Sequence, residues 1–207
     1  MDKLIQYFKE NSYVLVPNLL EPDIANFAYN YFILKGCTNQ DFSNAHEDIQ
    51  NDKWVRGAYG DLVAETILGH IEPRMSAITQ KKLCPTYSYT RLYITGDELK
   101  PHTDRPSCQY SVTMNLGGED WPIYYGVYDE ESKDGVVVKG KKVKILNEII
   151  LKPGDGAVYK GEDLVHWRDP FMGDHCCQTF LHYIDSEDEN YTKFKYDERV
   201  NIGFIKQ

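Results

Sequence analysis

Residues 89–117, YTRLYITGDELKPHTDRPSCQYSVTMNLG, contain two runs rich in aromatic and β-branched residues on either side of a polar segment with prolines. Such runs are typical of β-strands. In extended backbone, side chains two residues apart project to the same face, so His102 and Asp104 can converge on one point. This pattern predicts two ligands of a metal ion where a strand gives way to a loop. The alternative is a surface loop in which Asp104 caps a turn.

A third ligand is expected among the histidines of the second half of the chain. His166 follows a Gly-Asp turn and a short apolar run at the end of a predicted strand, and it is the best candidate. With His102 and Asp104 it would form a triad of two histidines and one carboxylate, which leaves three positions on Fe(II) for a bidentate cosubstrate and oxygen. The alternative for His166 is a buried core histidine. His175 and His182 are expected to be replaceable without loss of the metal.

The periodicity of the sequence changes along the chain. Residues 2–12, 21–36 and 61–79 have helical spacing with start and stop residues, and Pro73 is expected to interrupt or end the third helix. Residues 13–20 are rich in strand-forming residues, and residues 37–60 are polar and expected to form a loop. After about residue 85, short runs of Tyr, Val, Ile and Thr alternate with Gly, Asp, Pro and Lys clusters. This pattern predicts a β sandwich or barrel with helices gathered before it.

Composition excludes several classes of function. The 207 residues include 32 acidic and 23 basic side chains, a net charge of −9, which argues against binding to nucleic acid or to an anionic membrane. No apolar run approaches the roughly 20 residues that cross a bilayer, and the first residues lack the features of a signal peptide. We therefore expect a cytoplasmic protein with no nucleic-acid or membrane partner, as a monomer or weak homodimer.

The five cysteines include no CxxC pair, so neither a disulfide framework nor a structural zinc site is expected. Cys176 and Cys177 are adjacent in a predicted strand, which sends their side chains to opposite faces. Both are interpreted as small core residues.

Three segments together resemble the Fe(II)- and 2-oxoglutarate-dependent oxygenases, in particular their prolyl-hydroxylase-like branch. Residues 13–27, YVLVPNLLEPDIANF, resemble the strand and helix that precede the core of that branch. Residues 89–117 resemble its strand, Gly-Asp turn, metal motif and following strand. Residues 151–171, LKPGDGAVYKGEDLVHWRDPF, resemble its closing segment with the distal histidine.

The resemblance implies a fold and a set of roles. The fold is α+β and mainly β, a double-stranded β-helix of the jelly-roll or cupin type, with the N-terminal helices packed on one sheet. Residues 1–207 would form one domain, with a helical support (1–84), a catalytic β core (85–187) and a C-terminal tail (188–207). His102, Asp104 and His166 carry over as iron ligands. The implied cofactors are Fe(II), 2-oxoglutarate and O2, with ascorbate as a further candidate.

The cosubstrate site departs from the pattern of the family. Relatives hold the far carboxylate of 2-oxoglutarate with an Arg or Lys nine or ten residues after the distal histidine, where this chain has His175 and Cys176. Arg168, Arg91 and His175 are the candidate replacements. A permanently charged, bidentate donor suits a carboxylate best, so the arginines are favoured and Arg168 is placed first.

Alternation in residues 86–94, TYSYTRLYI, places Arg91 on one face of a strand with three tyrosines, Tyr93 among them. This face is either the exposed side of a sheet or the wall of a polar cavity. By resemblance, Tyr93 matches a cosubstrate-binding tyrosine, and Thr113 matches a second polar residue of that pocket.

The resemblance implies a dioxygenase that couples the decarboxylation of 2-oxoglutarate to succinate and CO2 with hydroxylation of a C–H bond. A protein or peptide side chain such as proline is the leading substrate. The alternatives are a hydroxylase of small molecules or free amino acids, and a cupin-like metal-binding module without oxygenase activity.

Overall fold

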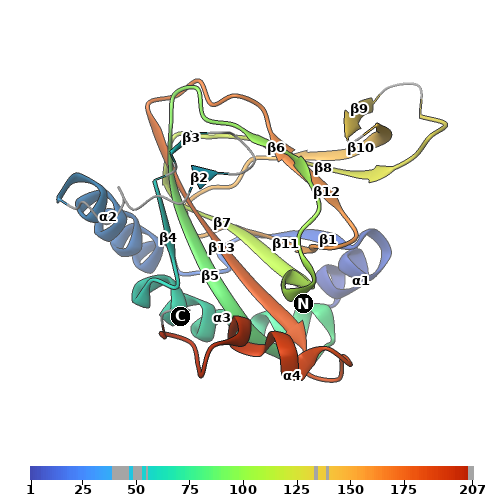
Figure 1. Cartoon of the computed structure of the whole chain (residues 1–207), viewed down its shortest axis with the longest axis horizontal. Helices are drawn as coiled ribbons and strands as arrows, with labels where there is room; N and C mark the ends of the chain where they lie inside the picture. The colour runs from blue at the N-terminus through green and yellow to red at the C-terminus, as the bar shows by residue number, and fades with distance from the viewer. Residues whose placement is uncertain (39–46, 49–52, 55, 133–134, 139, 205–207) are drawn as a thin grey trace.

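Two antiparallel β-sheets packed face to face form the body of the protein in the computed structural model, which describes residues 1–38, 47–48, 53–54, 56–132, 135–138 and 140–204 (Figure 1). Within these residues, the larger sheet has six strands in the order β1 (Tyr13–Val16), β11 (Gly156–Lys160), β7 (Tyr110–Gly118), β13 (His175–Asp185), β5 (Leu83–Ile94) and β4 (Gly57–Tyr59). The smaller sheet has five strands in the order β6 (Leu99–His102), β12 (Val165–Arg168), β8 (Ile123–Tyr128), β10 (Lys141–Ile149) and β9 (Gly135–Val138). A separate short pair joins β2 (Glu47–Asp48) to β3 (Lys53–Trp54).

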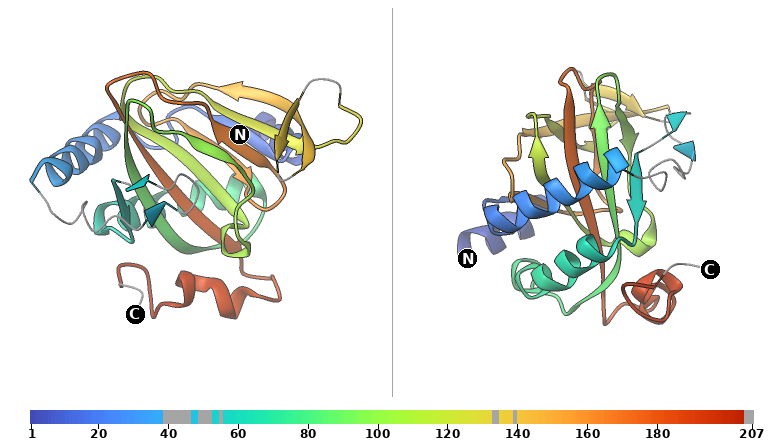
Figure 2. Two further views of the ribbon diagram at one scale, coloured as in Figure 1. Left: turned by 45° about the horizontal axis from the view of Figure 1, so that its top comes forward. Right: turned by 90° about the vertical axis from the view of Figure 1, so that its left-hand side faces the viewer.

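The helices lie on the outer face of the larger sheet (Figure 2). They are α1 (Asp2–Asn11), α2 (Pro22–Thr38) and α3 (Leu62–Thr79), and a short α4 (Tyr191–Phe194) follows the last strand. Their apolar side chains share one buried cluster with outward residues of the sheet. The predicted class, a mainly β double-stranded β-helix with N-terminal helices on one sheet, is confirmed. None of the described helices is long and apolar enough to cross a membrane.

Side chains of β7 show how one strand serves two environments. Val112 and Met114 belong to the cluster under the helices, whereas Ser111, Thr113 and Asn115 alternate with them on the opposite side of the strand. All five are buried. The space between the two sheets is therefore lined in part by polar groups, which is where a site can form.

The prediction that Pro73 ends or interrupts the third helix is wrong, because α3 continues through it to Thr79. Proline removes one backbone donor and crowds the preceding turn. Here Leu68 and Ile71 before Pro73, and Met75 and Ile78 after it, are all buried in the same cluster. Burial on both sides of the proline outweighs the local cost.

The loop predicted for residues 37–60 is also wrong in part. Helix α2 ends at Thr38 rather than at Gly36, and Gly57–Tyr59 forms β4, which pairs with β5. A Cβ at position 57 would lie 2.0 Å from the hydroxyl of Tyr89, so a larger residue there would have to displace the Tyr89 side chain. A three-residue edge strand such as β4 is stabilised by pairing with its neighbour, here β5. The weak periodicity of its own sequence therefore does not predict it.

Cys176 and Cys177 lie on opposite sides of β13, as predicted. Cys176 packs with Tyr93, Trp121 and Phe171 between the sheets, and Cys177 belongs to the cluster under the helices. Cys84, Cys108, Cys176 and Cys177 are all buried and free of disulfides.

A buried ion pair fastens the C-terminal segment to the helical layer. Arg199 donates to both carboxylate oxygens of Glu65, at 3.2 Å each, and to the carbonyl of Thr86. Glu65 also accepts hydrogen bonds from the backbone N–H of Ser88 and of Gly203. The last described segment is thus part of the packed structure.

We expect Arg199→Met to lower the free energy of unfolding by about 3–5 kcal/mol, because the Glu65 carboxylate would remain buried without a cation. Lys152→Ala is the control, since Lys152 and Asp120 form a pair with side chains 66% and 48% exposed. Its effect should stay within about 1 kcal/mol. Urea unfolding followed by tryptophan fluorescence measures both values, and equal losses would contradict a structural role for the buried pair.

Candidate metal centre and cosubstrate pocket

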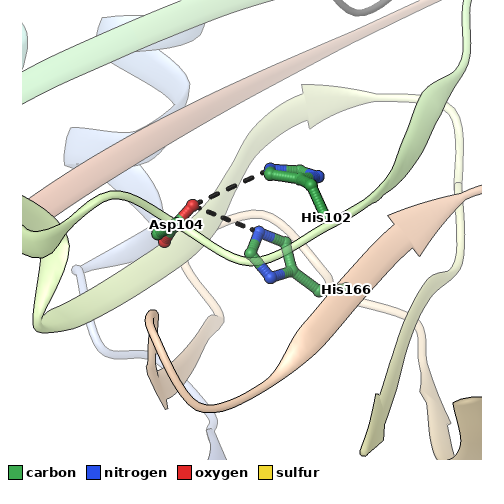
Figure 3. Close-up of side chains that lie close together, drawn as sticks. All are labelled: His102, Asp104 and His166. Carbon is green, nitrogen blue, oxygen red and sulfur yellow. Dashed lines mark ion pairs between the residues drawn. The ribbon is translucent and has the colours of Figure 1, made fainter. Parts of the chain in front are cut away.

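The register between β6 and β12 brings two histidines together. His166 is the direct cross-strand partner of His102, and their ring centroids lie 4.3 Å apart (Figure 3). Directly opposite residues of an antiparallel pair have Cβ atoms close enough for side-chain contact. Two residues far apart in sequence are therefore fixed side by side by backbone pairing.

Asp104 completes the group from the segment that follows β6. Its backbone N–H donates to the carbonyl of Gly161, 2.8 Å away, at the turn that precedes β12. Its Oδ1 lies 3.5 Å from Nε2 of His166 and 3.7 Å from Nε2 of His102 (Figure 3). One ligand atom from each of the three residues lies within 4.8 Å of the others, as a shared metal ion requires.

Backbone carbonyls select the tautomer of both histidines. Nδ1 of His102 is 2.8 Å from the carbonyl oxygen of Lys100, and Nδ1 of His166 is 3.1 Å from that of Leu164. Since a carbonyl only accepts, each Nδ1 carries the hydrogen and each Nε2 keeps its lone pair. In both residues it is Nε2 that faces Asp104, so both lone pairs point into the site.

The electrostatics of the site keep Asp104 ionised. Burial by itself raises the pKa of this carboxyl group, but its interactions with the surrounding imidazoles, His166 first and then His182 and His102, outweigh burial, and the pKa lies well below its usual range. The side chain of His166 is 3% exposed and that of His102 is 19% exposed. The group is thus closed on the His166 side and open to solvent on the His102 side.

A second layer of polar groups lies behind Asp104. Oγ of Ser111, on β7, is 3.0 Å from Oδ2 of Asp104 and 2.8 Å from Nδ1 of His182, on β13. Burial lowers the pKa of His182 to about 4, so its imidazole is neutral. Burial raises the pKa of the Cys108 thiol to about 12, and its sulfur contacts the hydroxyl of Tyr87 at 3.2 Å.

Arg168 lies two residues after His166 on the same strand and is 1% exposed. Its guanidinium donates to the carbonyl of Trp121 and, at 3.2 Å, to Oε1 of Gln178. Among the described residues, its Nε has no hydrogen-bond partner and no carboxylate lies within ion-pair distance. Burial lowers the pKa of Arg168, yet a guanidinium stays charged in proteins.

The other predicted cosubstrate residues also lie between the sheets. Tyr93 is 1% exposed and packs against Trp121, and the guanidinium of Arg91 lies 4.2 Å from the centre of the Tyr93 ring. The Arg91 face of β5 is therefore buried, which excludes the alternative that it is the exposed side of a sheet. Thr113 is fully buried on β7.

His175 lies apart from Arg168, at the start of β13 opposite Ile94. Its Nε2 is hydrogen-bonded to the hydroxyl of Tyr29, and its Nδ1 lies 2.9 Å from Asp174. Both nitrogens are thus engaged by groups outside the sheet interior. This placement favours the arginines over His175 as the anchor.

Sequence reasoning missed Gly161, Ser111, Gln178 and the position of His182. A Cβ at Gly161 would lie 2.2 Å from the carbonyl oxygen of Cys108 and 2.6 Å from Oδ2 of Asp104, so the absence of a side chain lets the Asp104 segment approach. The Lys-Gly-Glu-Asp turn before His166 was a signal for this residue. Ser111, Gln178 and His182 join the site through contacts between strands that are far apart in sequence, which the sequence does not reveal.

Searches with the sequence found no matching protein-family model and no matching curated protein. Solved structures do match. The α-ketoglutarate-dependent epimerase SnoN of nogalamycin biosynthesis has a TM-score of 0.67 and 13% identity, over 89% of this chain and 80% of SnoN. The carbocyclase SnoK of the same biosynthesis has a TM-score of 0.65 and 11% identity, over 95% and 92%. A prolyl-4-hydroxylase of Pseudomonas putida has a TM-score of 0.60 and 13% identity, over 87% and 96%.

These likenesses show that the chain has the fold of the 2-oxoglutarate-dependent oxygenases. The resemblance that the motifs predicted, including that to prolyl hydroxylases, is confirmed at the level of the fold. The three relatives carry out different reactions, so the fold does not choose among them.

We expect the affinity for a divalent metal ion to fall as pH decreases from about 8 to about 5.5, because histidine ligands must be neutral. Asp104, whose pKa lies well below its usual range, should stay ionised throughout. Calorimetric titration with Co(II) at several pH values measures the constant. A decrease that begins only near pH 4 would show that carboxylates rather than histidines hold the ion.

Proposed function

We propose that this protein is an Fe(II)- and 2-oxoglutarate-dependent oxygenase in which His102, Asp104 and His166 hold the iron. The observation that carries the proposal is the combined arrangement of this triad and Arg168. Three ligand atoms converge within 4.8 Å, and Arg168, a buried cation with no carboxylate partner among the described residues, lies two residues after the last ligand. His102 lies on β6, His166 and Arg168 lie on β12, and Asp104 lies in the segment that follows β6.

The donor set fits Fe(II). Two neutral imidazoles and one carboxylate form a facial triad, which leaves positions for a cosubstrate and oxygen. Zinc in structural sites prefers four protein ligands. The partial exposure of His102 supports access from solvent to the group of ligands.

Arg168 fits the far carboxylate of 2-oxoglutarate. A buried charge is costly unless it is paired, and within the described residues Arg168 contacts only neutral acceptors. Its charge also interacts with Tyr93 and Tyr125, which lie in the same interior. A bound carboxylate would supply the missing counter-charge and accept from Nε.

When bound, iron would supply the oxidative chemistry, in which R–H, O2 and 2-oxoglutarate give R–OH, succinate and CO2. The protein's residues position the reactants. Nε2 of His102 and of His166 present lone pairs, Arg168 orients the cosubstrate, and Tyr93 and Thr113 line its pocket. No side chain needs to act as a general base.

We propose a protein or peptide side chain such as proline as the substrate, a choice supported by the fold likeness to a prolyl-4-hydroxylase. A small molecule is the second candidate. It is favoured by the likeness to SnoN and SnoK, whose reactions belong to the biosynthesis of nogalamycin.

Iron-loaded protein should convert 2-oxoglutarate to succinate, and a panel of peptides and free amino acids should reveal a substrate that gains the mass of one oxygen. Asp104→Ala should abolish both products while the protein stays folded, because a ligand is lost. Mass spectrometry with and without ascorbate measures the coupling. Undiminished succinate formation by Asp104→Ala and His102→Ala at saturating iron would refute the triad.

Arg168→Met should weaken 2-oxoglutarate binding roughly a hundredfold, or about 3 kcal/mol, because the ligand's carboxylate would be buried without its partner. Arg168→Lys should restore part of the affinity, since an ammonium cannot reproduce the planar fork. Arg91→Met is the matched comparison. The apparent constant for 2-oxoglutarate at fixed iron separates them, and a loss confined to Arg91→Met would make Arg91 the anchor.

A further inference from the structure

Ser111 and His182 form a hydrogen-bonded chain that ends on Asp104. Oγ of Ser111 lies within hydrogen-bonding distance of three groups, which are Oδ2 of Asp104 at 3.0 Å, Nδ1 of His182 at 2.8 Å and the carbonyl of Cys108 at 3.2 Å. A hydroxyl has a single hydrogen to donate. The ionised carboxylate is the strongest acceptor of the three, so the hydrogen belongs on the Asp104 side.

This assignment fixes the roles of the other groups. If Ser111 donates to Asp104, then Nδ1 of His182 must carry a hydrogen and donate to Ser111. Ser111 and His182 come from β7 and β13, which are neighbours in the larger sheet and pair His182 directly with Ser111. Both residues are buried, and the ring of His182 packs against Tyr87 at 4.5 Å between centroids. The chain is therefore held rigidly by the sheet.

We propose that Ser111, held in turn by His182, is a positioning residue that occupies Oδ2 of Asp104 and so presents Oδ1 alone to the metal ion. The proposal rests on the proposed iron site. Its geometric basis is that the two carboxylate oxygens of Asp104 have different neighbours. Oδ1 faces Nε2 of both histidines, and Oδ2 faces Ser111. A carboxylate that bound through both oxygens would take one more position, which the cosubstrate and oxygen need.

A second metal ion is the competing interpretation, because Asp104, Cys108 and His182 also place ligand atoms within 4.8 Å of one another. The contacts favour the hydrogen-bonded chain. Nδ1 of His182 and Oδ2 of Asp104 already meet at Ser111, and the sulfur of Cys108 is engaged by Tyr87. These polar atoms satisfy one another without an ion.

Co(II) titration of the metal-free protein, followed by visible absorption and calorimetry, tests the proposal without any turnover. Wild-type protein should bind one Co(II) per chain. Ser111→Ala should raise the dissociation constant about 10- to 100-fold, as loss of a group that orients a ligand does, and should change the Co(II) absorption spectrum. His182→Leu should act in the same direction. His182→Asn, which keeps a donor near the position of Nδ1, should recover most of the affinity.

Thr179→Val is the matched control for stability. Thr179, also on β13, shares a buried hydrogen bond of 2.9 Å with Thr90 and has no contact with Asp104. It should lower resistance to urea and leave Co(II) binding unchanged. A Ser111→Ala constant within twofold of wild type would overturn the positioning role.

The outcomes also separate this proposal from the proposed function. No Co(II) binding by wild type, or binding that survives His166→Ala, would refute the iron site itself. Binding that His166→Ala abolishes and Ser111→Ala leaves unchanged would refute only the positioning role. Two Co(II) per chain, falling to one in Cys108→Ser, would establish the second metal ion in place of the hydrogen-bonded chain.

Discussion

The pairing of β12 with β6 is the constraint on which the site depends. Adjacent residues of a strand point to opposite faces, so a slip of one residue would place Trp167 inside and His166 outside. The packing shows this alternation. Trp167 stacks on Tyr124 in the apolar cluster on the face of the smaller sheet that is turned away from the larger one. His166 contacts Tyr125 and Tyr159 between the two sheets. The apolar cluster outside therefore stabilises the register that the polar group inside requires.

The interior between the sheets combines opposite charges in separate places. The Asp104 carboxylate lies among the imidazoles of His102 and His166. Arg168 lies on β12, two residues after His166, and the two charges are not paired with each other. Burying separate charges lowers stability. In the proposed function, a metal ion would offset the charge of Asp104 and a carboxylate of the cosubstrate would offset that of Arg168. The varied reactions of SnoN, SnoK and the prolyl-4-hydroxylase show that this fold does not fix the substrate.

The sequence predicted the features that depend on local pattern. Alternation in the strands predicted a β sandwich or barrel, and the resemblance to a known family narrowed this to the double-stranded β-helix. The His102-Thr-Asp104 spacing and the position of His166 after a Gly-Asp turn identified the three residues that the structure brings together. Pro73 was misjudged because its local cost is outweighed by burial of α3 on both sides. Ser111 and His182 could not be connected to Asp104 from sequence, since only the pairing of β13 with β7 makes them neighbours. The inward direction of Arg91 likewise needed the second sheet.

Arg105, the residue after Asp104, pairs with Asp197 at 3.0 Å, and Asp197 also accepts a hydrogen bond from Tyr59. Asp197 is buried in a run of three residues with positive φ, at 54°, 54° and 64°, a conformation that non-glycine residues seldom adopt. Arg105 precedes it by 92 residues and Tyr59 by 138. During synthesis on the ribosome, the segment beside Asp104 must therefore wait for a late part of the chain before its surroundings are complete.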